Sequence, residues 1–253
     1  MTPRDADRTG IEVPLDTSGR PAARHSGLVS PFAPRNVVIF GAAEFAALVG
    51  YLIENDSPHR VVAHTVDRPW CTQPNFGDHP LIPFEDLEQH HPPEASVLLL
   101  ALGGRGVNGL RAAKYEAARQ RGYECISYVS SRAIVWPNLQ IGDNCIICDS
   151  ANVNPFARIG NNCILRSGSL VSHHAVVGDH CFLAAGAIVA GSARVGERCF
   201  IGLNATIRDG INVAARCFIG AGAVVTADTE ENGIYLGVPA QRQAKPADQL
   251  EGC

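Results

Sequence analysis

The most informative pair of residues in the sequence is a histidine and a glycine 18 positions apart, His173 and Gly191. In a chain that repeats every 18 residues the two lie side by side, about 4.8 Å apart. The imidazole can take a proton from a nucleophile, and the glycine leaves a backbone N–H open to hold an oxyanion. A base beside such a donor is what acyl transfer needs, whereas a histidine alone on a surface turn is usually only solvated.

The 18-residue spacing comes from a shorter repeat in the second half of the chain. An aliphatic residue occupies every sixth position from Ile141 to Val225. A small residue follows four positions later, and at 18-residue intervals it is a cysteine: Cys145, Cys163, Cys181, Cys199 and Cys217. Three six-residue units, each a strand and a turn, close one triangular coil, so the pattern predicts a parallel β-helix over residues 131–241. We expect the cysteines to fill one corner as small buried side chains.

Two further features of the repeat carry predictions. Glycine often follows the aliphatic residue, and we expect it there because glycine admits unusual backbone angles. The residue before each aliphatic points outward. One outer face is therefore an apolar column, which we expect a neighbouring subunit or the C-terminal segment to cover: Ile146, Ile164, Phe182, Phe200 and Phe218.

Residues 34–130 alternate strands with helices, which predicts a small parallel sheet of Rossmann-like type. We expect strands at 36–40, 60–66, 95–102 and 123–129, a helix from Phe45 to Ile53, and a helix over 107–121 with one side formed by Leu110, Ala113 and Ala117. Ligands of such sheets bind at the carboxyl ends of the strands, where Gly41, Asp67 and Gly103 stand. A tight strand-to-helix turn explains Gly41 equally well.

Composition sets the remaining expectations. The proline-containing residues 1–33 are predicted to be a disordered tail, and residues 242–253 a C-terminal tail. The formal net charge of −4 gives no reason to expect nucleic acid or an anionic membrane as partner. The sequence shows no apolar run of roughly 18 residues and no secretory signal at its start, so we expect a cytoplasmic protein.

A metal site is the alternative use of the solenoid histidines. The γ-class carbonic anhydrases hold zinc on a β-helix with three histidines shared between subunits. Here His174 and His180 are six residues apart and lie on adjacent faces, and no other coil supplies a histidine. We therefore expect no metal.

Three stretches carry a resemblance to a known family: residues 38–42 (VIFGA), residues 170–178 (LVSHHAVVG) and residues 237–240 (GVPA). The second half resembles the left-handed β-helix acyltransferases. From about residue 36 to 242 the chain looks like the bacterial sugar acetyltransferases, which join a Rossmann-like sugar-nucleotide domain to such a helix. That family includes N-acetyltransferases of nucleotide-linked amino sugars and the sialic acid O-acetyltransferases.

The resemblance implies a homotrimer with acetyl-CoA in a groove between neighbouring β-helices and with His173 as general base. It implies contacts to acetyl-CoA from Gly191, Gly202, Gly220, Gly237 and Pro239. It implies contacts to the sugar nucleotide from Gly41, Ala42, Asp67 and Gly103.

The sequence departs from the family pattern at two places. His174 stands where the family has an acidic residue that orients the base, and we include it among the catalytic candidates. Glu44, Phe45 and Ala46 replace the second half of the family's nucleotide loop.

The function expected from these residues is acetyl-CoA-dependent N-acetylation of a nucleotide-linked amino sugar, in the synthesis of surface polysaccharide or glycan precursors. Sugar O-acetylation on the same fold is the alternative, because amine and hydroxyl both need a base. A non-catalytic trimeric scaffold and a metalloprotein like γ-class carbonic anhydrase are further alternatives.

Overall fold

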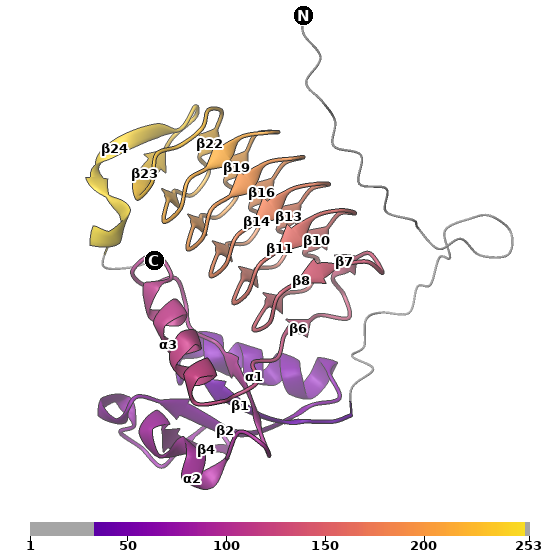
Figure 1. The fold of residues 1–253 in the computed structure, drawn as a ribbon, viewed down its shortest axis with the longest axis vertical. Coiled ribbons are helices and arrows are strands. Elements are labelled where there is room, and N and C mark those ends of the chain that lie inside the picture. Colours follow the sequence, from indigo (N-terminus) through magenta and orange to yellow (C-terminus); the bar gives the residue numbers. More distant parts are fainter. Residues whose placement is uncertain (1–32, 251–253) are drawn as a thin grey trace, which may run out of the picture.

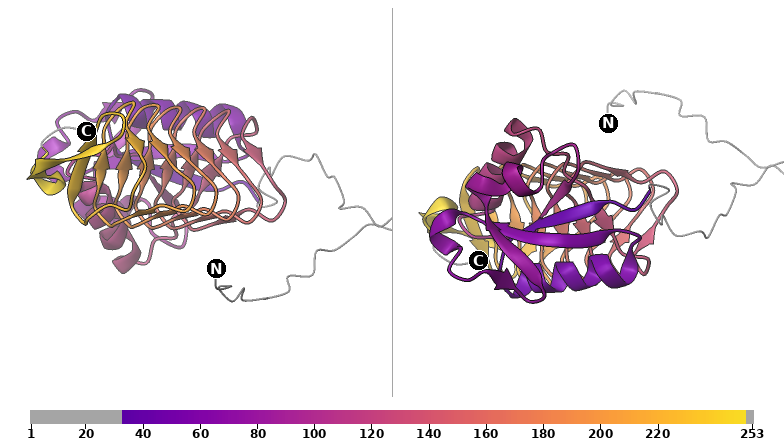
Figure 2. Two further views of the ribbon diagram at one scale, coloured as in Figure 1. Left: turned by 90° about the horizontal axis from the view of Figure 1, so that it is seen from above. Right: turned by 90° about the horizontal axis from the view of Figure 1, so that it is seen from below.

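The computed structural model describes residues 33–250, so most of the two predicted tails lies outside it. Its N-terminal sheet and helices lie along one side of a long stack of triangular coils (Figure 1). Figure 2 shows the same arrangement from above, where the coils lie in front of the N-terminal domain, and from below, where the N-terminal domain lies in front of the coils. None of the helices in the described range is long and apolar enough to cross a membrane.

The N-terminal domain is a five-stranded sheet in the order β3-β4-β2-β1-β5, in which β1, β2, β4 and β5 run parallel. Its strands are β1 Asn36–Phe40, β2 Arg60–Val66, β3 Asn75–Phe76, β4 His79–Pro83 and β5 Val97–Leu100. Its helices are α1 Glu44–Asp56, α2 Leu87–His90 and α3 Gly109–Gln120, with short 3-10 turns at Arg68–Trp70 and Phe84–Asp86. Alternate residues of the strands point to opposite faces of the sheet and belong to two separate apolar clusters. One cluster contains residues of α1 and the other contains residues of α3, so the two helices pack on opposite faces.

Three expectations for this domain need correction. The hairpin of β3 and β4 was not predicted, because Pro80 and Pro83 obscure the strand pattern. The strand expected over 123–129 is only a bridge at Cys125 followed by β6, Tyr128–Val129, which already belongs to the β-helix. The expected face of α3 is wrong, since Leu110 is 42% exposed and the helix instead buries Arg111 and its neighbours.

The β-helix is built from strands of two residues, and from β8 onward each ends on one of the predicted aliphatic positions. They are β7 Ile134–Val135, β8 Gln140–Ile141, β9 Ile146–Ile147, β10 Asn152–Val153, β11 Arg158–Ile159, β12 Ile164–Leu165, β13 Leu170–Val171, β14 Val176–Val177, β15 Phe182–Leu183, β16 Ile188–Val189, β17 Arg194–Val195, β18 Phe200–Ile201, β19 Thr206–Ile207, β20 Asn212–Val213, β21 Phe218–Ile219 and β22 Val224–Val225. All pairings within the coils are parallel with an 18-residue register, as the spacing predicts.

Three sheets form the sides of the triangular stack. Sheet I has the order β24-β23-β21-β18-β15-β12-β9-β6, in which β23 is Gly233–Leu236 and β24 is Gln241–Pro246. Sheet II has the order β22-β19-β16-β13-β10-β7, and sheet III has the order β20-β17-β14-β11-β8. The aliphatic residues and the small corner residues form one continuous interior, in which all five of the periodic cysteines are buried.

The C-terminal segment is structured beyond the expected boundary at residue 241. Strand β23, Gly233–Leu236, pairs antiparallel with β24, Gln241–Pro246, and a 3-10 turn follows at Ala247–Gln249. Because Ala247 is fully buried, the described part of the predicted tail belongs to the fold.

The glycines that follow the aliphatic residues are needed for space and not for backbone angle. The left-handed residue of each turn comes two positions later, as at Asn162 (φ 54°) and His180 (φ 61°). A Cβ added at Gly160 would come within 2.8 Å of the backbone nitrogen of Asp179 on the next coil. The glycine therefore permits two coils to approach each other.

The apolar column on sheet I is covered within the chain, which corrects the expectation of a neighbouring subunit there. Ile146, Ile164 and Phe182 pack against α1 and the N-terminal sheet. Phe200 and Phe218 pack against a cluster that includes residues of the loop before α3 and of the C-terminal segment. This column consequently gives no support to a trimer.

Candidate functional site

The two predicted catalytic histidines lie at the corner between sheets II and III, in the turn that joins β13 to β14. We call this the histidine corner, residues 172–175 together with the same turn in the adjacent coils. His173 and His174 are both exposed there, and their Nδ1 atoms are 3.2 Å apart. This contact is a hydrogen bond when one Nδ1 carries a proton and donates, and the other Nδ1 is unprotonated and accepts.

The structure places His173 beside Gly191, as the 18-residue spacing predicts. A Cβ added at Gly191 would lie 2.7 Å from Cε1 and 2.9 Å from Nε2 of His173. Any side chain at this position would collide with the imidazole. The glycine therefore permits the His173 ring to lie directly against the Gly191 backbone.

The Gly191 N–H has an acceptor that the sequence reasoning did not include. It donates to Oδ1 of Asp209, on the next coil, at 2.7 Å. The same carboxylate oxygen would be 3.2 Å from a Cβ at Gly191, so it lies close to the His173 ring. The expected oxyanion donor is therefore occupied by an exposed carboxylate in this conformation.

His174 has a different environment from His173. It adopts the left-handed conformation, with φ of 58°, and stacks on Phe156 of the preceding coil at a ring separation of 4.8 Å. Its Nδ1 contacts the ring of His173. This geometry fits a residue that orients the neighbouring imidazole.

The four residues predicted to contact the sugar nucleotide, Gly41, Ala42, Asp67 and Gly103, follow the ends of three adjacent strands of the N-terminal sheet. Gly41 (φ 140°) packs so closely on Ala101 that a Cβ would lie 2.9 Å from its carbonyl oxygen. Asp67 accepts from Lys114 Nζ at 2.5 Å, which joins the end of β2 to α3. Lys114 was not among the predicted residues, although its position on a helix beside the sheet edge is a signal that could have indicated it.

The backbone donors at this edge differ from one another. The Gly41 N–H donates to Thr65 O within the sheet and is not available to a ligand. Ala42, the next residue, is half-buried at the start of the turn into α1. At Gly103 nothing lies within 4 Å of the position of an added Cβ, so that loop is open.

The remaining residues predicted to contact acetyl-CoA lie at another corner, between sheets I and II. Added Cβ atoms at Gly202 and Gly220 would lie 2.7 Å from Ala221 N and 2.3 Å from Leu236 Cδ2. These glycines permit close packing of coils. Residues 237–240, which include Gly237 and Pro239, form an exposed loop that hydrogen-bonds to Val224 at the end of sheet II. The outer face of sheet II thus lies between His173 and this loop.

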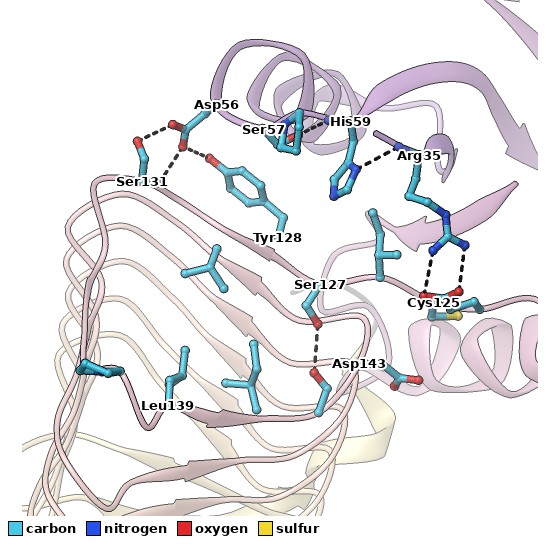
Figure 3. Close-up of a pocket in the computed structure, with 17 residues that line it drawn as sticks. Arg35, Asp56, Ser57, His59, Cys125, Ser127, Tyr128, Ser131, Leu139 and Asp143 are labelled. Carbon is cyan, nitrogen blue, oxygen red and sulfur yellow. Dashed lines mark hydrogen bonds and ion pairs between the residues drawn. The ribbon is translucent and has the colours of Figure 1, made fainter. Parts of the chain in front are cut away.

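A cavity of about 560 Å³ opens at the base of the β-helix, between the end of α1 and the first coil (Figure 3). Asp56, His59, Tyr128 and Leu139 are among its lining residues. It contains none of the predicted site residues, and its walls come from the N-terminal domain and from the start of the β-helix.

His180 is a structural residue at the corner between sheets III and I. It is half-buried, and its Nδ1 lies 2.8 Å from Nδ2 of Asn162. Burial lowers its pKa. Within residues 33–250 no three His, Cys, Asp or Glu side chains are grouped so that they could hold a metal ion.

The two candidate sites lie on opposite sides of one chain. The N-terminal domain packs against sheet I, whereas the histidine corner joins the other two sheets. A ligand bound at the strand ends of the N-terminal sheet is consequently separated from His173 of the same chain by the body of the β-helix.

Comparison with protein families identifies the repeats. Residues 138–173, 156–191 and 174–209 match the bacterial transferase hexapeptide repeat, and residues 192–227 match the hexapeptide repeat of succinyl-transferase. The repeat region is therefore that of a hexapeptide-repeat acyltransferase, as the sequence predicted. A search of curated protein sequences finds no match.

The solved structures that are similar to 83% of this chain include bacterial acetyltransferases. One is a histidine-to-asparagine variant of perosamine N-acetyltransferase from Caulobacter crescentus in complex with CoA and GDP-perosamine. It is 27% identical with a TM-score of 0.76, and the match covers 83% of this chain and 97% of that one. Another is the acetyltransferase domain of PglB from Neisseria gonorrhoeae, 25% identical with a TM-score of 0.76, where the coverage is 83% and 100%. WeeI from Acinetobacter baumannii, at 20% identity and a TM-score of 0.71 over 83% and 100% of the two chains, supports the fold.

Proposed function

We propose that this protein is an acetyl-CoA-dependent N-acetyltransferase that acts on a nucleotide-linked amino sugar, in the synthesis of surface polysaccharide or glycan precursors. The observation that carries the proposal is the exposed His173 imidazole lying directly against the Gly191 backbone, in a chain similar over almost its whole described length to a sugar N-acetyltransferase. We regard the N-terminal domain as a Rossmann-like sugar-nucleotide domain on the same grounds.

In the proposed reaction the sugar amine attacks the thioester carbonyl of acetyl-CoA. A C–N bond forms, the C–S bond breaks, and CoA leaves as the thiol. His173 takes the proton that the amine loses and returns it to the departing CoA thiolate, a role open to its exposed imidazole. His174 fixes the orientation of that imidazole through the contact between the two Nδ1 atoms.

The Gly191 N–H is the proposed donor to the thioester oxygen, and this requires Asp209 to turn away. Asp209 is exposed, so its side chain can exchange the hydrogen bond to Gly191 for bonds to water. An Asp209→Ala variant should bind acetyl-CoA more tightly, because the carbonyl no longer competes with a carboxylate for the same donor. We expect KM for acetyl-CoA to fall about tenfold, the size of one charge-assisted hydrogen bond. An unchanged or higher KM would remove Gly191 from this role.

A homotrimer would bring the two candidate sites together. Because the strand ends and His173 of one chain lie on opposite sides, a sugar held by one copy would have to react at the histidine corner of a neighbour. The outer face of sheet II carries Ile134, Leu170, Ile188 and Val224 and has no cover in the described part of the chain. This face is the proposed contact between copies. Light scattering that gave a mass of 26.9 kDa at micromolar concentration would contradict it.

The direct test is release of CoA thiol from acetyl-CoA in the presence of a panel of nucleotide-linked sugars. We expect turnover with an amino sugar and none with the matched sugar that carries a hydroxyl in place of the amine. Turnover only with the hydroxyl sugar would make the enzyme an O-acetyltransferase. Release with neither, together with no binding of acetyl-CoA, would leave the β-helix as a scaffold.

A further inference from the structure

The loop between β5 and α3 presents a run of unused backbone donors. Among residues 33–250 the N–H groups of Gly103 to Val107 have no hydrogen-bond acceptor. Gly104 is buried nonetheless, and an unpaired buried N–H is uncommon in proteins. Arg105, at the exposed tip of the loop, forms no ion pair with any described residue. Free donors and a free cation on one loop indicate a site for an anion.

The shape of this loop is held under strain. Gly106, Val107 and Asn108 are left-handed in succession, with φ of 61°, 48° and 62°. For a β-branched residue such as Val107 this conformation is unfavourable and persists only where the surroundings impose it. Val107 and Asn108 are both buried, and Asn108 Nδ2 donates to Cys199 O on the β-helix.

The residue that links this loop to the β-helix is Arg111, one turn into α3. It is fully buried, and its guanidinium has no carboxylate partner in the described chain. Burial lowers its pKa to about 10, which leaves it charged at neutral pH. Such a charge needs close acceptors on every side, since an uncompensated buried cation is strongly destabilising.

Carbonyl groups from two parts of the molecule surround the guanidinium. On the β-helix side, Nη2 donates to His180 O at 2.9 Å and to Cys181 O at 3.1 Å, and Nε to Asn162 O at 3.4 Å. On the loop side, Nη1 lies 3.4 Å from Leu102 O and 3.3 Å from Gly103 O. It also lies 3.2 Å from the Asn108 side-chain oxygen.

The two loop carbonyls determine where the adjacent donors point. In a trans peptide the C=O and the following N–H face opposite ways. Because the carbonyls of Leu102 and Gly103 face Arg111, the N–H groups of Gly103 and Gly104 face away from it. Gly103 is open on its outer side, since an added Cβ would touch nothing within 4 Å.

We infer that Arg111 is a positioning residue that orients the Gly103 and Gly104 N–H groups toward the diphosphate of the nucleotide-linked substrate. The inference rests on the proposed function for the identity of the substrate. Arg111 itself does not touch the ligand, because it is enclosed by the loop and the β-helix.

A second contact between the domains provides a matched control. Asp56, at the end of α1, accepts from Tyr128 Oη at 2.6 Å and from Ser131 N at 2.9 Å, and so joins the N-terminal domain to the first coil (Figure 3). Asp56 is remote from the loop between β5 and α3, because α1 ends at the opposite end of the parallel strands. Its loss should weaken the contact between the domains without changing the orientation of the loop donors.

The test compares Arg111→Lys with Asp56→Asn by calorimetry, with GDP and UDP as probes and guanosine and uridine as their phosphate-free counterparts. In Arg111→Lys, which keeps the charge and loses the planar fork, we expect diphosphate affinity to fall about tenfold and nucleoside affinity to stay the same. Asp56→Asn should lower the melting temperature and leave all the affinities unchanged. In steady state, only Arg111→Lys should raise KM for the sugar nucleotide, with KM for acetyl-CoA unaltered.

A further variant covers the case in which Arg111→Lys does not fold. Gly103 has open space and no positive φ, so Gly103→Val should fold and should weaken diphosphate binding by crowding the donors. Equal weakening of diphosphate and nucleoside in Arg111→Lys, or unchanged diphosphate binding in the folded variants, would overturn the inference. The calorimetric measurements need no turnover, so an inactive wild-type enzyme would contradict the proposed function separately.

Discussion

Two corners of the same β-helix carry histidines in equivalent turns, and they differ in almost every respect. His174 and His180 have nearly the same left-handed backbone, with φ of 58° and 61°. At the corner between sheets II and III both imidazoles are exposed, and the His173 ring lies against the backbone of Gly191. At the corner between sheets III and I, His180 is half-buried, and its backbone carbonyl accepts from Arg111.

The difference lies in what covers each corner. Helix α3 lies against the second corner, where Tyr115 packs on the His180 ring at 5.5 Å. No described residue of the N-terminal domain packs against the first corner in the same way. One repeat therefore supplies a structural histidine and a candidate base, and the docking of a separate domain decides which is which. Variants at the exposed corner should therefore change turnover, and variants at the covered corner should change the free energy of unfolding.

The largest expected effect is on turnover at the exposed corner. His173→Ala removes the proposed base and should lower kcat by about 10²–10⁴. Acetyl-CoA binding and the melting temperature should change little, because the side chain is exposed. Single-turnover kinetics on the true substrate, with acetyl-CoA affinity measured by calorimetry, checks this. Unaltered turnover would refute the catalytic interpretation of the corner.

At the covered corner the expected effect is on stability. His180→Ala removes the partner of the buried Asn162 amide, and an unsatisfied buried group costs about 1–3 kcal/mol. Denaturant unfolding should show this loss, while kcat per folded enzyme stays the same. A loss of kcat comparable to that of His173→Ala would mean that the two corners do not differ as proposed.

A smaller effect is expected at His174. If this residue only orients His173, then His174→Ala should lower kcat about tenfold or less. His174→Asn, which keeps a polar group near Nδ1 of His173, should recover part of the activity. An effect as large as that of His173→Ala would show that the two imidazoles act together or that their roles are reversed.

The smallest effect is expected on the thiols that fill the covered corner. The five periodic cysteines are buried, which blocks the access of a reagent to all of them. Burial raises the pKa of Cys163 and Cys181 well above the usual range, whereas the hydrogen bond with Cys199 lowers the pKa of Cys217 to about 6. A thiol-specific reagent should therefore label Cys71, which is partly exposed, and leave the periodic cysteines unreacted without denaturant. Cys253, expected to react first, lies outside the described residues. Rapid native labelling of all five would contradict their corner placement.

Much of the β-helix could be predicted from sequence because its backbone repeats. An 18-residue coil converts sequence distance directly into spatial contact, so the buried aliphatic series and the approach of His173 to Gly191 follow from counting alone. In the N-terminal domain the bounds of β1 and β2 were also predicted correctly, because each strand is a local apolar run. The error about glycine arose because a clash between coils is not visible in a single coil.

Other features depend on contacts between distant parts of the chain, and only the tertiary structure decided them. Helical periodicity predicted that Leu110 lies on the buried face of α3, whereas docking on the β-helix buries Arg111 instead. The β-helix carbonyls that accept from Arg111 belong to residues 51 to 70 positions away in the sequence. The sequence identified an apolar column on sheet I but not the domain that covers it. Asp209, whose carboxylate accepts from the Gly191 N–H, was not among the residues predicted from the sequence. Side-chain direction and domain docking are set by packing, which a repeat does not encode.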